Sequence, residues 1–147
     1  MPLIIRPLRS EDRDQWLPLW DGYNLFYDRP NFPAEITDAT WARFLDPAEP
    51  VFAAVAEVDG KLVGLVHCLY HRSTTSVELV CYLQDLFTMP EARGMGVGRA
   101  LIEYVYGEAA KAGSRRVYWQ THEANPARKL YDRVAALTPF RRYVKDL

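Results

Sequence analysis

The sequence predicts a single α/β domain built around one mixed sheet that is mostly antiparallel. The apolar runs 51–58 and 61–71 are joined by Asp59-Gly60, a strong signal for a two-residue hairpin turn. Further along, an apolar run of helical period separates two strand-like runs, and a helical crossover makes the strands that it joins parallel. At 147 residues, the chain has room for one domain spanning 1–147.

The remaining elements follow from helix caps, chain breakers and periodicity. Ser10 offers a helix N-cap, and Pro30 and Pro33 interrupt the apolar pattern that follows it. Pro90 cannot continue a strand, and Gly113 is placed to end a helix. We expect strands at 3–8, 51–58, 61–71, 78–88, 115–121 and 139–144, the last as a closing or edge segment, and helices at 10–26, 37–45, 97–112 and 125–134.

Composition and charge exclude several classes of function. Eighteen basic and nineteen acidic residues give a net charge of −1, so no global field gathers nucleic acid or an anionic membrane. No apolar run approaches the ~20 residues that span a bilayer, and the N-terminus lacks the features of a signal peptide. We therefore expect a cytoplasmic protein without nucleic-acid or membrane partners, in which Cys68 and Cys81 are buried free thiols.

The most informative segment is the turn Arg93-Gly94-Met95-Gly96-Val97-Gly98-Arg99-Ala100, which leads into the helix at 97. Backbone N–H groups at a helix start suit a phosphate or pyrophosphate. A nucleotide P-loop would need Lys followed by Ser or Thr where Arg99 and Ala100 stand. A dinucleotide fingerprint would need glycine at the sixth position counted from Gly94, which is again Arg99.

Arg93, Gly96 and Gly98 resemble the pyrophosphate motif of the GNAT superfamily of N-acetyltransferases, and the expected element order is also that of the superfamily. Segment 82–90 resembles the fourth strand of the diamine and polyamine branch, and segment 127–132 resembles the last helix of the family with its tyrosine. Trp119-Gln120-Thr121, Asn125 and segment 130–135 are most similar to the small histone and polyamine acetyltransferases. The resemblance implies the acyl-CoA N-acyltransferase fold, with helices on both faces of the sheet. It also implies acetyl-CoA as co-substrate and no metal.

On the donor side, the resemblance implies that the strand before the turn pairs its backbone with the pantetheine arm and that Tyr131 protonates the departing thiolate. The residues expected to bind the coenzyme are Leu86, Phe87, Thr88, Arg93, Gly94, Met95, Gly96, Val97, Gly98, Arg99, Asn125 and Arg128. Asn125 stands six residues before Tyr131, whereas seven is common in the family. An N-cap role before Pro126 is therefore an alternative for Asn125.

On the acceptor side, a carboxylate can bind a protonated amine and then take its proton. Asp85 is the first candidate, with Glu78 and Glu123 behind it. The polyamine branch has an acid where this chain has Gln84, which favours an acceptor of lower charge, such as a single primary amine or an amino acid. The residues expected to contact the acceptor are Asp21, Tyr23, Tyr27 and Gln84, with Asn24 and Asp28 nearby.

The expected activity is acetyl transfer to a primary amine by direct attack in a ternary complex. The expected acceptors are a small amine, a polyamine, an amino acid or a lysine-bearing peptide. The alternative is a non-catalytic acyl-CoA sensor or structural subunit with the same fold. A hydrolase is disfavoured because His67 and Cys68 are strand neighbours that point to opposite faces. The family is often dimeric, and the aromatic segment 140–144 is a candidate homodimer interface.

Overall fold

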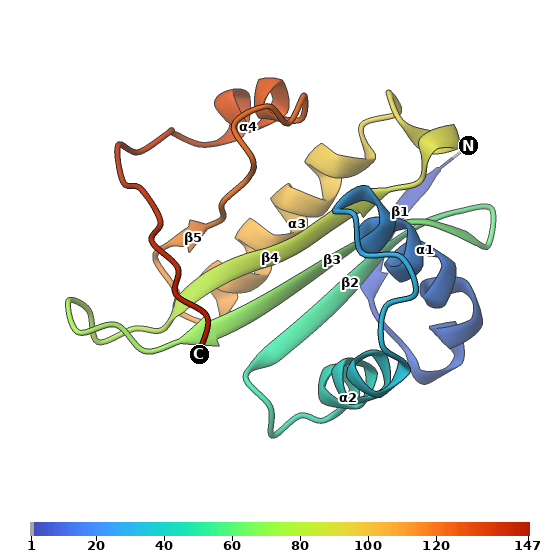
Figure 1. The fold of residues 1–147 in the computed structure, drawn as a ribbon, viewed down its shortest axis with the longest axis horizontal. Coiled ribbons are helices and arrows are strands. Elements are labelled where there is room, and N and C mark those ends of the chain that lie inside the picture. Colours follow the sequence, from blue (N-terminus) through green and yellow to red (C-terminus); the bar gives the residue numbers. More distant parts are fainter. Residues whose placement is uncertain (1) are drawn as a thin grey trace.

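A computed structural model describes residues 2–147 as a five-stranded sheet with strand order β1-β2-β3-β4-β5 and helices on both faces (Figure 1). The predicted fold class is confirmed. The strands are β1 Leu3–Pro7, β2 Val51–Val58, β3 Lys61–His71, β4 Val80–Thr88 and β5 Val117–Tyr118. The helices are α1 Arg13–Phe26, α2 Ala34–Leu45, α3 Val97–Lys111 and α4 Arg128–Val134, with short 3-10 turns at Ser10–Asp12 and Pro90–Ala92.

Alternation along the strands divides the core between the two faces of the sheet. On β2, Ala54 and Ala56 pack toward α3, whereas Val55 packs toward α1 and α2. The face under α1 and α2 is filled by Trp16, Leu19, Trp20, Trp41 and Leu65. The opposite face is filled by Val66, Val97, Leu101, Ile102 and Val105, together with the buried thiols Cys68 and Cys81. Both cysteines are therefore free and buried, as expected.

A bulge in β4 and a short β5 leave part of the sheet open. His67 of β3 faces Asp85, but its neighbour Cys68 faces Leu83, so Gln84 is an extra residue on β4. Parallel pairing between β4 and β5 covers only two positions, Cys81 with Val117 and Tyr82 with Tyr118. The backbone of β4 from residue 83 to 88 is consequently unpaired on the side that faces α4.

Three expected elements differ from the structure near the C-terminus. The strand expected at 115–121 is limited to Val117–Tyr118, and the last helix begins at Arg128 rather than at 125. The strand expected at 139–144 is wrong, because no helix or strand follows Val134 in the described chain. A two-residue β5 offers little edge for another strand, and Pro139 lacks the N–H that pairing requires.

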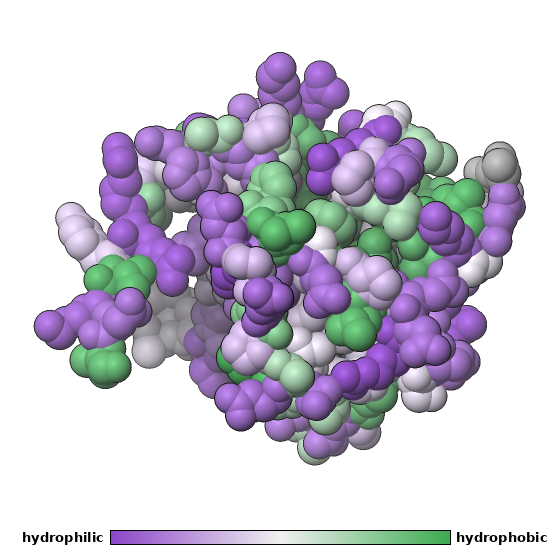
Figure 2. Space-filling model, turned by 45° about the vertical axis from the view of Figure 1, so that its right-hand side comes forward, coloured by the Kyte–Doolittle hydropathy of each residue, from purple (hydrophilic) through white to green (hydrophobic). Residues whose placement is uncertain are grey.

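The second helix begins at Ala34, three residues before the predicted start, because Pro33 takes its N-cap position. Among the described residues, no helix is both long and apolar enough to cross a bilayer. Figure 2 shows that polar side chains cover most of one face of the molecule, with apolar side chains in small separate patches.

Candidate active site

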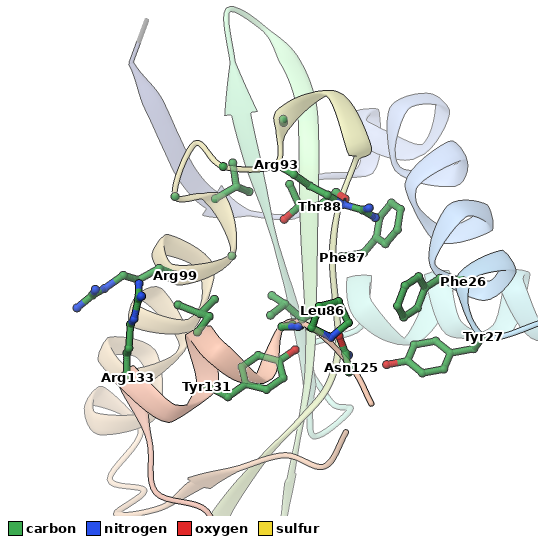
Figure 3. A pocket seen from close by; sticks show the side chains of 18 residues that line it. Phe26, Tyr27, Leu86, Phe87, Thr88, Arg93, Arg99, Asn125, Tyr131 and Arg133 are labelled. Carbon is green, nitrogen blue, oxygen red and sulfur yellow. Dashed lines mark hydrogen bonds between the residues drawn. The ribbon is translucent and has the colours of Figure 1, made fainter. Parts of the chain in front are cut away.

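A cavity of about 590 Å³ lies between the free edge of β4, the start of α3, the helix α4 and the end of α1 (Figure 3). Most of the residues expected to bind the coenzyme line it. These are Leu86, Phe87, Thr88, Arg93, Gly94, Gly96, Val97, Gly98, Arg99 and Asn125. Met95 and Arg128 are not among the lining residues. Met95 is 53% exposed, and Arg128 donates a hydrogen bond to the carbonyl of Glu123 at 2.8 Å.

The glycine turn offers the cavity a set of open backbone N–H groups. Gly94 and Gly96 have φ values of +84° and +80°, which L side chains rarely adopt. A Cβ at either position would meet nothing within 4 Å, so each glycine also leaves open space beside the cavity. The first helical hydrogen bond of α3 runs from the N–H of Ala100 to the carbonyl of Gly96. The N–H groups of 97–99 precede this ladder and are available to a ligand.

Three arginines line the cavity near this turn. Arg93 donates from Nε to the carbonyl of Thr88 at 3.3 Å, and its guanidinium lies 6.0 Å from the Phe87 ring. Arg99 donates from Nε to Glu103 at 2.9 Å. Arg133 of α4 points to the same side of the cavity as Arg99 (Figure 3). Arg133 was not predicted from the sequence. A residue two positions after Tyr131 lies on nearly the opposite side of the helix, and only a long side chain there can reach the cavity.

Asn125 fixes the entry into α4. Its side-chain oxygen accepts the N–H of Ala127 at 2.9 Å, and its amide nitrogen donates to the Thr121 hydroxyl at 2.9 Å. Asn125 is not the N-cap itself, because Ala127 takes that position, but its side chain holds the N–H of Ala127. Asn125 also lines the cavity, so its backbone and side chain form part of the wall between α4 and β4.

Tyr131 stands on α4 with its hydroxyl in the cavity, facing Tyr27 across it (Figure 3). The Tyr131 ring packs edge-on against Trp119, with centroids 5.4 Å apart. Within residues 2–147 its hydroxyl forms no hydrogen bond. Burial and then the proximity of Tyr27 raise the pKa of Tyr131 to about 12, so the phenol keeps its proton at every ordinary working pH.

Asp85 is held by a buried hydrogen-bonded chain. The Trp16 indole N–H donates to Nε2 of His67 at 3.1 Å. Because an indole N–H can only donate, Nε2 carries the lone pair and the proton of a neutral His67 lies on Nδ1. Nδ1 then donates to Oδ2 of Asp85 at 2.9 Å. His67 is 1% exposed and Asp85 is 8% exposed, so both side chains are buried, and neither is among the residues that line the cavity.

Two phenols from α1 and its end lie beside this carboxylate. Tyr23 is buried with its hydroxyl 3.5 Å from the carbonyl of Gln84, and Tyr27 lines the cavity. Burial first, and then the negative charge of Asp85, raises the pKa of each phenol. The two tyrosines expected to contact the acceptor are therefore close to Asp85.

The other acceptor-side candidates lie elsewhere. Asp21 is exposed on α1 and Gln84 is exposed at the bulge, and neither lines the cavity. Glu78 lies 3.6 Å from Arg115, and Glu123 is exposed in the turn before α4. His67 was not among the site residues predicted from the sequence. Its link to Asp85 depends on the strand register and the bulge, which hydropathy patterns do not reveal.

Comparisons with known proteins agree on one family. The model of the acetyltransferase (GNAT) family matches residues 8–136. The chain is 37% identical over 139 residues to the D-amino-acid N-acetyltransferase HPA3 of Saccharomyces cerevisiae, covering 92% of this chain and 86% of that protein. It is 30% identical over 129 residues to the uncharacterized N-acetyltransferase YhfO of Bacillus subtilis, covering 87% and 85%.

Solved structures share the fold at low sequence identity. A probable acetyltransferase superposes with a TM-score of 0.84 at 22% identity, covering 100% of this chain and 98% of the other. AAC(6')-Iy, solved with a bisubstrate analog, superposes with a TM-score of 0.81 at 19% identity and the same coverage. The chain belongs to the GNAT family of acetyltransferases and is an N-acetyltransferase.

Proposed function

We propose that this enzyme transfers the acetyl group of acetyl-CoA to the α-amino group of a free amino acid by direct attack in a ternary complex. The observation that carries the proposal is the convergence of three features on one cavity. These are the unpaired edge of β4, the open N–H groups at the start of α3, and Tyr131. Asp85 lies close by, beside Tyr27 of the same cavity.

The donor half of the cavity suits a phosphate-bearing thioester. The N–H groups of the glycine turn and the positive end of α3 match a pyrophosphate, with Arg93, Arg99 and Arg133 supplying charge around it. The free edge of β4 can pair with the amides of a pantetheine arm as an added strand does. A β4 N–H directed at the thioester carbonyl would stabilise the oxyanion.

The residues near the reacting atoms suit amine acylation. An alkylamine of pKa near 10 is only about 0.1% neutral at pH 7, so it must lose a proton before it attacks. We assign this proton to Asp85, directly or through water. The amine nitrogen then bonds to the acetyl carbon and releases its second proton to solvent, the carbon–sulfur bond breaks, and the Tyr131 phenol protonates the sulfur. The phenol regains its proton from solvent.

Two observations support an amino acid as the acceptor. The yeast relative at 37% identity is named a D-amino-acid N-acetyltransferase. At the bulge, Gln84 supplies no charge, so Asp85 is the single acid of the pair expected for polyamine acceptors. One carboxylate matches one ammonium group, whereas a polyamine presents several.

A homodimer is part of the same proposal. Phe140 and Tyr143 are 88% and 96% exposed in a segment without regular structure. Large apolar side chains at such exposure are typical of an interface. Sedimentation of the full chain is expected to give the mass of a dimer, and truncation after Thr138 is expected to give a monomer.

The test is a screen for coenzyme-thiol release. The purified chain is incubated with acetyl-CoA and D- and L-amino acids, a polyamine, a simple primary amine or a lysine-bearing peptide. Turnover with amino acids is expected to be the fastest. Turnover restricted to the polyamine or the peptide would contradict the acceptor assignment. Tight acetyl-CoA binding without turnover of any amine would favour the sensor alternative.

A further inference from the structure

The end of α1 places one arginine back over the helix that precedes it. Asp28 has φ +57°, and its N–H donates to the carbonyl of Leu25. The N–H of Arg29 donates to the carbonyl of Asn24 at 2.9 Å. This pair of bonds is the Schellman motif, which reverses the chain direction at a helix end. As a result, Arg29 lies over the last turn of α1 rather than beyond it.

The Arg29 side chain is held from several sides. Its Nε donates at 2.9 Å to the side-chain oxygen of Asn24, which is fully buried and fixed by a second hydrogen bond to the carbonyl of Trp20. Its guanidinium carbon lies 5.7 Å from the Tyr23 ring, 5.4 Å from the Tyr27 ring and 5.9 Å from the Phe32 ring. A guanidinium held in this way loses little further entropy when it binds an anion.

No acid neutralises this guanidinium within residues 2–147, because the ion pairs of the described chain do not include Arg29. Its Nε is occupied by Asn24, whereas its two terminal nitrogens make no hydrogen bond to a described residue. Those terminal nitrogens form the planar fork that binds a carboxylate through two parallel hydrogen bonds.

Arg29 and Asp85 act on the same two phenols. The charge of Asp85 raises, and that of Arg29 lowers, the pKa of both Tyr23 and Tyr27. The guanidinium contacts both rings, and Tyr27 in turn lines the cavity opposite Tyr131. A fixed cation and a fixed anion therefore lie close to one pair of rings, and of these four residues Tyr27 lines the cavity. A ligand with an ammonium group and a carboxylate on one carbon complements this pair of charges.

We propose that Arg29 binds the α-carboxylate of the acceptor while Asp85 binds its amino group, so that the enzyme selects free amino acids over amines without a carboxylate. This inference rests on the proposed function and extends it to a specificity-determining residue. If Arg29 served only to cover the aromatic rings, its replacement would change kcat and KM alike for all amine acceptors.

The experiment compares each amino acid with its carboxamide, which keeps the amine but removes the negative charge. Wild-type enzyme, Arg29→Met and Arg29→Lys are assayed for kcat and KM with both compounds, in both enantiomers. Arg29→Met keeps an unbranched apolar chain over the rings. Arg43→Met removes an exposed arginine of α2 and is the matched control. Melting temperature and acetyl-CoA affinity verify that each variant is folded.

We expect Arg29→Met to raise KM for the free amino acid roughly 10- to 100-fold, as for loss of a charged hydrogen bond, and to leave the carboxamide nearly unchanged. Arg29→Lys should retain part of the preference, and it replaces Arg29→Met as the test if that variant is unfolded. An acid-to-amide ratio equal in wild type and the folded variants would overturn the role of Arg29 while leaving the proposed function intact. A wild-type enzyme that acetylates no amino acid would overturn both.

Discussion

The two halves of the proposed active site, one for the acetyl donor and one for the acceptor, are formed by different parts of the chain. The donor half consists mainly of backbone: the open edge of β4 and the N–H groups of the glycine turn. The proposed acceptor half consists of side chains from the end of α1, from β3 and from β4: Tyr27 lines the cavity, and His67 and Asp85 form a buried pair outside its lining. Phosphate and amide recognition needs a backbone shape, which neighbouring glycines specify. Amine recognition needs charges that only the fold assembles.

Asp85→Asn is the substitution with the largest expected effect, and it should impair the acceptor half alone. In Asp85→Asn, the amide oxygen can still accept the hydrogen bond from His67, but the carboxylate is lost. We expect kcat/KM to fall about 10²–10⁴-fold, the usual range for a general base. Affinity for acetyl-CoA, measured by calorimetry, should be unchanged.

Asp14→Asn, an exposed site on α1, is the control and should retain full activity. Equal loss of coenzyme affinity and turnover in Asp85→Asn would show that Asp85 supports the whole cavity rather than the acceptor half.

Gly96→Val has the next largest expected effect and should impair the donor half alone. It places a β-branched residue at φ +80° in the turn, and the backbone must move to relieve the resulting strain. We expect acetyl-CoA affinity to fall at least ~100-fold, as for the loss of two charged hydrogen bonds.

Gly113→Val imposes similar strain, at φ +83°, on the other end of the same helix α3. It should lower the melting temperature to a similar extent while leaving coenzyme affinity intact. If both variants bind acetyl-CoA equally well, the glycine turn is not the pyrophosphate site.

Tyr131 stands where the two halves meet. Tyr131→Phe should lower kcat about 100-fold with coenzyme affinity retained, as for the loss of a general acid. Tyr143→Phe, which alters a tyrosine that is 96% exposed, should have no effect on kcat. Unaltered kcat in Tyr131→Phe would remove the acid role.

The pKa of about 12 also sets a pH dependence. The folded pKa lies above the unfolded value near 10, so this contribution to stability is complete below pH 10 and is lost as the pH rises toward 12. The free energy of unfolding, measured by denaturation at pH 9 and at pH 12, should fall less between these two pH values in Tyr131→Phe than in the wild type.

Arg99→Gln has the smallest expected effect, and it tests whether the donor half binds the coenzyme mainly through backbone groups. Arg99 is about half exposed and is paired with Glu103. Arg99→Gln should weaken acetyl-CoA binding only about 2- to 5-fold, and high salt should reduce the difference, because exposed charges are well screened. Glu103→Gln frees Arg99 and should leave affinity equal or slightly higher. A loss in Arg99→Gln as large as in Gly96→Val would contradict this view.

The sequence predicted the local elements around the cavity better than the contacts between distant residues. The hairpin at Asp59-Gly60 and the glycine turn are local signals, and the structure contains both. The link between His67 and Asp85 depends on a bulge at Gln84, which an alternating pattern does not reveal. Arg29 is turned back over α1 by a Schellman turn at Asp28, although aspartate is not the usual residue for that conformation.

The C-terminal part was the least predictable. Val117 to Trp119 is apolar and aromatic enough for a longer strand, but β5 pairs at only two positions because β4 diverges beyond its bulge. The same divergence opens the cavity. The aromatic residues of 139–144 resemble strand residues by composition, yet the edge strand that precedes them, β5, is only two residues long.

Mass spectrometry of one reaction mixture tests the central claim most directly. Wild-type protein, acetyl-CoA and an amino acid are incubated, and both the amino acid and the intact protein are weighed. We expect an acetyl group on the α-nitrogen of the amino acid and none on the protein at any time. An acetyl group on Cys68 or Cys81 that passes to the acceptor, or an amino acid that stays unmodified while acetyl-CoA binds, would contradict it.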